Sequence, residues 1–399
     1  MDIKEKRNNK IGIIAGSIML MSSLTISALL ADIQALYPNV GMDKIVLTLT
    51  IPNLAGMLFA FAAGPLTLRF AKKHLLLGGM FLGFLGGVIA YVFGSISLNV
   101  LYLSSLFIGI NQGLNGSLTK ALVPDFFEGQ ERDDMIGFQA SSSTAGSIAL
   151  TMVAGILAGT FWKNSYLVFL AFIPCMILVQ KNITYIPPVK KSASTGEKVK
   201  LTPAVYFTAL TIFVSYVFLF THQANISVFI KSNNLGNVTT AGYANSIFVT
   251  GGLLTGLLFG KFRKVVGFKT MQAGMIVLVI GFLGNRFIGN LTAAFFSAFC
   301  TGVAQAFLIP SAVLAVAKYT PESMRAVGIS LVMGALNFGM FMSPKIMTPL
   351  TATFGGGDLH MKYMYAAIGL IAVLVLHTIL SPIFYPVKKE IEQIAVSDK

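Results

Sequence analysis

Long apolar runs, separated by short polar or charged segments, recur along almost the whole chain. Each run holds about 20 residues, the length an α-helix needs to cross the roughly 30 Å hydrocarbon core of a bilayer. The pattern predicts twelve transmembrane helices. Their approximate spans are 11–33, 43–66, 75–94, 98–123, 135–160, 164–183, 204–229, 239–260, 270–288, 292–317, 327–350 and 361–384.

The first run resembles a signal peptide, because cations between Lys4 and Lys10 precede it and small residues stand at Ala28 and Ala31. It is longer than the apolar core of a typical signal peptide, and further spans follow it. We therefore predict that residues 11–33 form a retained transmembrane helix.

The composition supports a membrane protein of the all-α class. Hydrophobic residues make up 55% of the chain and charged residues only 11%, whereas soluble domains carry about 25% charged residues. The net charge of +14 does not indicate nucleic-acid binding, because the cations lie mainly between spans and at the termini. With both termini in the cytoplasm, 23 of the 29 Lys and Arg residues fall on the inner side. The positive-inside rule therefore predicts a multi-pass protein of the cytoplasmic membrane with both termini cytoplasmic.

Enzyme chemistry and cofactors find no support in the sequence. The segment GLLTGLLFGK, 252–261, lacks the Ser or Thr that follows Lys in a nucleotide-binding loop. No soluble segment is long enough for an ATPase domain, and Cys175 and Cys300 fall inside predicted spans, so we expect free thiols. We predict no catalytic residues, no cofactor and no metal site, and an energy source in an ion or substrate gradient.

The polar segment IPPVKKSASTGEKVKLTP, 186–203, divides the twelve spans into six and six. Its Pro, Ser and Lys residues are typical of a linker. We predict an N-terminal six-helix bundle over 1–185, a cytoplasmic linker over 186–203, and a C-terminal six-helix bundle with a cytoplasmic tail over 204–399.

The two halves also share sequence features in the same order. GPLTLRFAKK at Gly64 is matched by GKFRKVVGFK at Gly260, an offset of 196. GINQGLNG at Gly109 is matched by GVAQAFLI at Gly302, and ERDDMIG at 131 by ESMRAVG at 322, with offsets of 193 and 191. Near-constant offsets indicate an internal duplication with both halves in the same orientation.

These decapeptides resemble the loop between helices two and three of the major facilitator superfamily, G-x-x-x-D-R-x-G-R-K, which the second half of that family repeats. The resemblance covers essentially the whole chain and implies two pseudo-symmetric six-helix bundles, similar to bacterial drug and metabolite exporters. Leu68 stands where the family usually has Asp, and Ala71 where it has Gly, which puts the family's latch at that Asp in doubt. The matching residues either gate the inner side or only anchor the loops. They are Gly64, Arg69, Lys72, Lys73, Gly260, Gly267 and Lys269.

The resemblance also implies that spans one, four, seven and ten line a central cavity. Polar side chains share helical faces in these spans, and such faces avoid lipid. They form either a hydrogen-bonding substrate cavity or contacts that hold helices together. The candidates are Thr25, Asn111, Gln112, Asn115, Thr211, Ser215, His222, Gln223, Asn225, Thr301 and Gln305.

Three ionisable residues are candidates for coupling or gating. Asp32 and Lys345 lie at similar depth near the outer ends of spans one and eleven, and they form either an ion pair or two separate interfacial charges. His222 is either a proton-sensitive group or a packed neutral histidine.

The sequence thus favours a secondary transporter of a small organic molecule, most simply an exporter, with proton antiport left open. Two features of proton-driven drug exporters are absent: Gly109 replaces their Arg in span four, and span five lacks their Gly-Pro signature. One alternative is uptake or exchange of a small organic anion that uses Lys345, and another is a non-transporting membrane receptor or scaffold. We expect a monomer whose partners are its substrate, the lipid bilayer and, for antiport, protons, and we expect no nucleic acid.

Overall fold

The computed structural model of the chain describes residues 3–29, 33, 36–40, 42–158, 161–188, 201–236 and 238–385. The N half comprises α1 (Ile3–Ile18), the 3₁₀ segment η1 (Ser22–Leu29), α3 (Met42–Thr67), α4 (Lys72–Phe93), α5 (Leu98–Phe126), α6 (Gly129–Ala158), the 3₁₀ segment η2 (Trp162–Ala171) and α7 (Phe172–Asn182). The C half comprises α8 (Pro203–Ser232), α9 (Val238–Val266), η3 (Gly267–Lys269), α10 (Thr270–Phe287), α11 (Leu291–Tyr319), α12 (Glu322–Gly355) and α13 (Leu359–Phe384).

The architecture is all-α with twelve membrane-crossing units, as the apolar runs predict. Eleven units in the described chain are long and apolar enough to cross a membrane. The twelfth, α5, does not reach that level of hydropathy, because it carries Asn111, Asn115 and Lys120 along with several Ser and Thr residues. A helix of this composition is tolerated in a bilayer only where other helices surround it.

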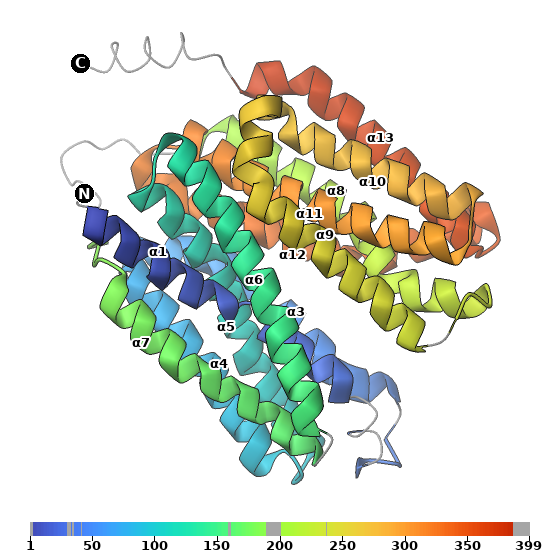
Figure 1. The fold of residues 1–399 in the computed structure, drawn as a ribbon, viewed down its shortest axis with the longest axis horizontal. Helices are drawn as coiled ribbons and strands as arrows, with labels where there is room; N and C mark the ends of the chain where they lie inside the picture. The colour runs from blue at the N-terminus through green and yellow to red at the C-terminus, as the bar shows by residue number, and fades with distance from the viewer. Residues whose placement is uncertain are drawn as a thin grey trace.

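The helices form two bundles that lie side by side (Figure 1). The start of α1 and the end of α13 lie on the same face of the molecule, which we call the terminal face, and the opposite face is the distal face. Since successive helices alternate in direction, α3, α5, α9 and α11 end at the terminal face, and α6 and α12 begin there.

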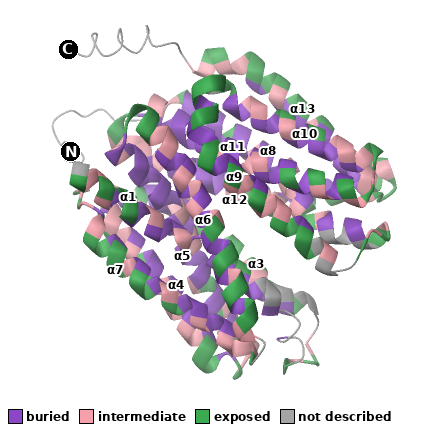
Figure 2. Cartoon of the chain, viewed as in Figure 1, coloured by how far each residue is buried: buried purple, intermediate pink, exposed green. Residues whose placement is uncertain are grey.

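Burial distinguishes central helices from peripheral ones. In α11, 78% of the apolar window is buried inside the protein, against 17% in α13. Figure 2 shows the same contrast, with exposed residues along the outer helices and buried ones where helices face each other. The exposed apolar side chains of α13 therefore suit contact with lipid, whereas α5 and α11 lie at the centres of their halves.

The first and sixth units are not continuous α-helices. The α1 helix ends at Ile18, a turn follows, and η1 begins at Ser22. Helix α7 is likewise preceded by the 3₁₀ segment η2. Apolar length alone predicts that a segment crosses the membrane, but it carries no information on whether the backbone stays α-helical throughout.

Candidate functional site

Polar side chains of three elements of the N half meet at Gln112 of α5. Ser23 of η1 donates a hydrogen bond from Oγ to Gln112 Oε1 at 2.7 Å, and Gln112 Nε2 donates to Asn53 Oδ1 of α3 at 3.3 Å. Three elements thus contribute to one polar cluster. Because Gln112 and Asn53 are not buried, this cluster can exchange its hydrogen bonds for bonds to a ligand.

Two neighbouring candidates have a different environment. Asn111 and Asn115 are fully buried, and their Nδ2 atoms donate to the carbonyl oxygens of Met19, at 3.3 Å, and Gly16, at 2.8 Å. These acceptors lie in the last turn of α1 and just after it, where helical hydrogen bonding ends and carbonyl groups lack partners within the helix. The two amides therefore stabilise the break in the first unit, and Thr25 is satisfied locally by the carbonyl of Ser22 at 2.8 Å.

The C half has a matching pair of glutamines. Gln223 of α8 donates from Nε2 to Oε1 of Gln305 of α11 at 3.4 Å, and neither side chain is fully buried. Gln112 and Gln305 lie at the same offset, 193 residues, that relates the repeated segments GINQGLNG and GVAQAFLI. The duplication therefore places one amide on the central helix of each half.

The remaining candidates of the C half are packed. His222 is 2% exposed, with Nδ1 3.3 Å from Ser297 Oγ and its ring beside those of Phe282 and Tyr363. Thr211 and Thr301 donate to carbonyl groups of their own helices. The Oγ atom of Ser215 is buried without a described partner. Asn225 accepts a hydrogen bond from Lys362 Nζ at 3.2 Å.

Of the pair proposed at the distal side, Asp32 lies outside the described residues. Lys345 is exposed, with Nζ 4.2 Å from the centre of the Phe341 ring. It lies eighteen residues, about five full turns, beyond Val327 on α12, so both residues are on the same face of that helix. Val327 packs against α3 of the N half, so Lys345 faces the same interface nearer to the distal face.

On the terminal side, contacts between the halves involve both copies of the repeated glycine. A Cβ at Gly64 of α3 would lie 2.6 Å from Val327 Cα and 2.9 Å from Ser330 Cβ of α12. The equivalent position, Gly260 of α9, lies against Asp134 and Gln130 of α6, and its carbonyl accepts from Gln130 Nε2 at 3.0 Å. At Gly64 the neighbour is the backbone of α12, so a side chain would prevent this close approach. At Gly260 the neighbours are side-chain ends of Asp134 and Gln130, which a side chain would displace.

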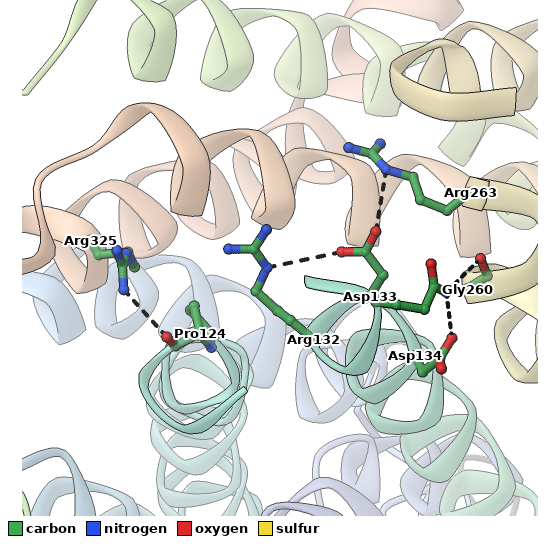
Figure 3. A network of polar contacts seen from close by, with 8 residues as sticks. Pro124, Arg132, Asp133, Asp134, Gly260, Arg263 and Arg325 are labelled. Atoms are coloured by element: carbon green, nitrogen blue, oxygen red, sulfur yellow. Dashed lines mark hydrogen bonds and ion pairs between the residues drawn. The ribbon is translucent and has the colours of Figure 1, made fainter. Parts of the chain in front are cut away.

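Charged residues reinforce these contacts (Figure 3). Asp133 of α6 lies between Arg132, at 3.9 Å, and Arg263 of α9, at 3.7 Å. Arg325 of α12 donates to the carbonyl of Pro124 at the end of α5, at 3.3 Å. A cavity of about 230 Å³ adjoins this network, lined by Gly129, Gln130, Arg132, Asp133, Arg263, Gly267, Leu314 and Lys318.

The other predicted loop residues have different roles. Lys72 pairs with Asp125 of α5 at 2.5 Å, and Lys73 donates to the carbonyls of Gln180 and Ile183 near the end of α7, so these contacts lie within the N half. Arg69 and Lys269 are exposed, and Gly267, the first residue of η3, has a φ of +65°, a conformation that favours glycine.

Sequence reasoning did not identify several charged residues of this region as functional. Asp133 and Arg325 lie in the matched segments ERDDMIG and ESMRAVG, so the duplication was the available signal. Lys120, one of the 23 cations counted on the inner side, lies inside α5 with 7% of its surface exposed.

The structure consists of two six-helix bundles, each with a glutamine on its central helix. A network of charged and glycine contacts joins the bundles on one side. This arrangement defines a membrane carrier fold. The sequence matches the model of the Major Facilitator Superfamily over residues 11–220 and 208–395, and the chain belongs to this family. It is a secondary transporter that works by alternating access, and not an enzyme. No curated protein matches it in sequence.

Solved structures share the fold at low sequence identity. The human organic anion transporter MFSD10 (TETRAN) superposes with a TM-score of 0.73 at 12% identity, covering 92% of this chain and 99% of its own. The fucose:proton symporter FucP of E. coli gives 0.74 at 11%, covering 92% and 97%. A bacterial homologue of the iron transporter ferroportin, in an outward-facing state, gives 0.70 at 14%, covering 94% and 100%. At these identities the likeness shows the fold alone.

Proposed function

We propose that this chain exports a small organic molecule across the cytoplasmic membrane and binds it between Gln112 on one half and Gln223 and Gln305 on the other. The observation that carries the proposal is the contrast in burial. These amides are partly exposed and bond to other side chains, Gln112 to Ser23 and Asn53, and Gln223 to Gln305, whereas Asn111 and Asn115 are buried and donate to backbone carbonyls of the first unit. Amide groups at partly exposed positions offer both donors and acceptors to a polar ligand.

The proposed orientation places the terminal face in the cytoplasm. The distribution of Lys and Arg supports it, with 23 of 29 on that side. The arrangement described then corresponds to an outward-facing state, because the contacts between Gly64 and α12 and between Gly260 and α6 lie on the terminal side. The ferroportin homologue, described as outward-facing, shares this fold.

Proton antiport is the proposed source of energy. His222 supports it, because it is a buried titratable group next to Gln223 in sequence and within 3.3 Å of Ser297 on α11. A change of its protonation would alter the packing between α8 and α11, which carry the two glutamines of the C half. We propose that the transporter acts as a monomer, since each bundle buries its own core and the two halves of one chain complete the site.

Uptake or exchange of an organic anion is the second candidate. Lys345 favours it, since this exposed cation lies on the face of α12 that packs against the N half nearer to the terminal side. MFSD10, with the same fold, is described as an organic anion transporter.

The test is transport in proteoliposomes with an imposed pH gradient. Compounds that raise the unfolding temperature of the purified protein, which bound ligands do by mass action, are offered in radiolabelled form. Proton-driven accumulation that Gln112→Ala and Gln305→Ala abolish would support the proposal. A protein that binds ligands but moves none of them would contradict it, and would favour a receptor or scaffold.

A further inference from the structure

We propose that Lys120 of α5 binds an anionic group, a carboxylate or a phosphate, of the transported molecule. This inference rests on the proposed function, because it names the substrate class for the same site. It differs from the assignment of Lys345, which lies near the distal end of the transport path.

Lys120 is a buried cation without a counter-charge among the described residues. Its side chain is within a membrane-crossing helix and 93% of the residue surface is buried, 7% being exposed. The Nζ atom donates one hydrogen bond, to the carbonyl of Gly116 at 2.9 Å, and none of the ion pairs in the described chain includes it. An ammonium group has three donors, and an unpaired cation inside a membrane protein is costly and usually marks a functional site.

Lys120 lies two turns beyond Gln112 on α5, turned by about 80° toward the side on which Gly113 packs against α3. Steps of four residues lead from Gln112 to Gly116 and then to Lys120, a stripe that turns by about 40° per step. The flanking faces of α5 are occupied: Gly113 packs against Gly56 of α3 on one side, and Asn115 bonds to α1 on the other. Gly116, between them, lies against Leu20 of the first unit, and Lys120 is about 12 Å closer to the terminal face than Gln112.

The C half contributes a polar group at the same level. Helices α3 and α5 run in parallel, with Ser117 Oγ 3.5 Å from the carbonyl of Ala60, so Lys120 is level with residues 63 and 64. A Cβ at Gly64 would lie 3.2 Å from Ser330 Oγ of α12, and this buried hydroxyl has no described hydrogen-bond partner. Lys120 and the Ser330 hydroxyl thus lie at one level of the bilayer, on either side of the α3 contact at Gly64.

This level lies directly beneath the closed side of the protein. Pro124, one helical turn beyond Lys120, accepts the hydrogen bond from Arg325 of the C half. An anion bound to Lys120 would offset the free-energy cost of burying the ammonium charge. This gain is largest in the state in which the two halves meet around the charge. Binding would therefore change the relative stability of the two transport states, which is what a substrate must do.

The charges available along the path favour an anion over a cation. Among the predicted spans, only Asp32 and Asp43 carry a carboxylate, and both belong to distal ends. Lys345 lies on the α12 face directed at the interface, nearer to the distal side. An anion on this path would meet Lys120 near the terminal face and Lys345 nearer to the distal face, and both attract it.

The test uses the full chain, purified in a non-ionic detergent without anionic lipid. Its unfolding temperature is recorded with organic carboxylates and phosphate esters, each beside a neutral analogue, beginning with benzoate and phenyl phosphate beside benzamide and phenol. The variants are Lys120→Met, Lys120→Arg and the control Lys163→Met. Lys163 lies in η2 with Nζ 5.6 Å from the centre of the Phe161 ring, and its replacement removes the same charge away from the path.

We expect anions, but not their neutral analogues, to stabilise the wild type, Lys120→Arg and Lys163→Met. The apparent affinity of Lys120→Met should fall at least about tenfold, since charge-assisted hydrogen bonds are the strong ones. A second measurement needs no variant: the stabilising anion should slow acylation of Lys120, but not of Lys163, by a membrane-permeant lysine reagent, read by peptide mass spectrometry.

Three results would overturn the proposal: no anion stabilises the wild type, Lys120→Met keeps the full effect, or the anion leaves acylation of Lys120 unchanged. A requirement for phosphatidylglycerol in nanodiscs would also overturn it, because a lipid headgroup would then be the ligand. If proteoliposomes transport a neutral solute and anions do not change the rate of this transport, the inference about Lys120 is wrong and the proposed function still holds.

Discussion

Replacement of Gly64 by valine should force the two halves apart at the terminal face. A Cβ at this position would lie 2.6 Å from the backbone Cα of Val327 and 2.9 Å from Ser330 Cβ, whereas ordinary carbon contacts are about 3.5 to 4.0 Å. The backbone of α12 cannot rotate out of the way, so the helices must separate by roughly 1 Å. Overpacking of this kind costs about 1 to 3 kcal/mol, and here the cost applies only to the terminal-closed state.

The expected consequence is a shift of the conformational equilibrium by about 5- to 150-fold toward the terminal-open state. Spin labels on cysteines at Arg69 and Glu322, both exposed at the terminal face, would report the separation by pulsed electron resonance. Cys175 and Cys300 are replaced by alanine in this background. The longer-distance population should increase in Gly64→Val relative to the parent.

The control is Gly78→Val in α4, where an added Cβ has no atom within 4 Å. It introduces the same side chain into a helix of the same half without touching the other half. An unchanged distance distribution in a folded Gly64→Val protein, or an equal change in both variants, would refute the reasoning that this contact holds the closed state.

Three further predictions follow from the same structure. Asp133→Asn should weaken the terminal contacts by about 1 to 3 kcal/mol, seen as a larger open population with the same spin labels, whereas an unaltered distribution would show that its ion pairs do not hold the gate. Asn115→Leu should lower the free energy of unfolding by about 1 to 3 kcal/mol, because the buried Gly16 carbonyl loses its donor, and a thermal unfolding temperature equal to that of the wild type would contradict this role. Gln305→Leu should weaken ligand binding by about tenfold with little loss of stability, measured by ligand-dependent thermal shift, and retained affinity would remove Gln305 from the site.

The number and order of the membrane-crossing units could be predicted from the sequence, because the length of an apolar run relates directly to the thickness of the bilayer. The break after Ile18 could not be predicted. The residues around it are apolar or small, and the carbonyl groups freed there find their partners on Asn111 and Asn115, about 90 positions away in the chain. Such compensation depends on tertiary packing.

The candidate site was predicted as a group of polar faces, but sequence periodicity could not separate lining residues from packing residues. Gln112 and Asn111 are adjacent in sequence, yet one is partly exposed and the other is fully buried. The distinction depends on where α1 and α4 pack against α5. The positive-inside count gave no information on the burial of Lys120, since that rule treats a cation at a helix end and one inside the helix alike.

The structure explains why the decapeptide occurs once in each half. Gly64 in the first copy contacts α12 of the C half, and Gly260 in the second contacts α6 of the N half. The glycines recur because each half presents a close-approach surface to the other at the terminal face. The cations that follow them differ in their contacts, since Lys72 and Lys73 bond within the N half.

The reactivity of single cysteines toward a membrane-impermeant thiol reagent added outside the cell shows directly whether the site between the halves opens to the distal side. We predict that Gln112→Cys and Gln305→Cys react from outside, because the halves close on the terminal face, whereas Asn111→Cys, at a fully buried position, stays protected. Equal protection of all three cysteines, or labelling of the glutamine positions only from the cytoplasmic side, would contradict an outward-facing carrier with its site between the two halves.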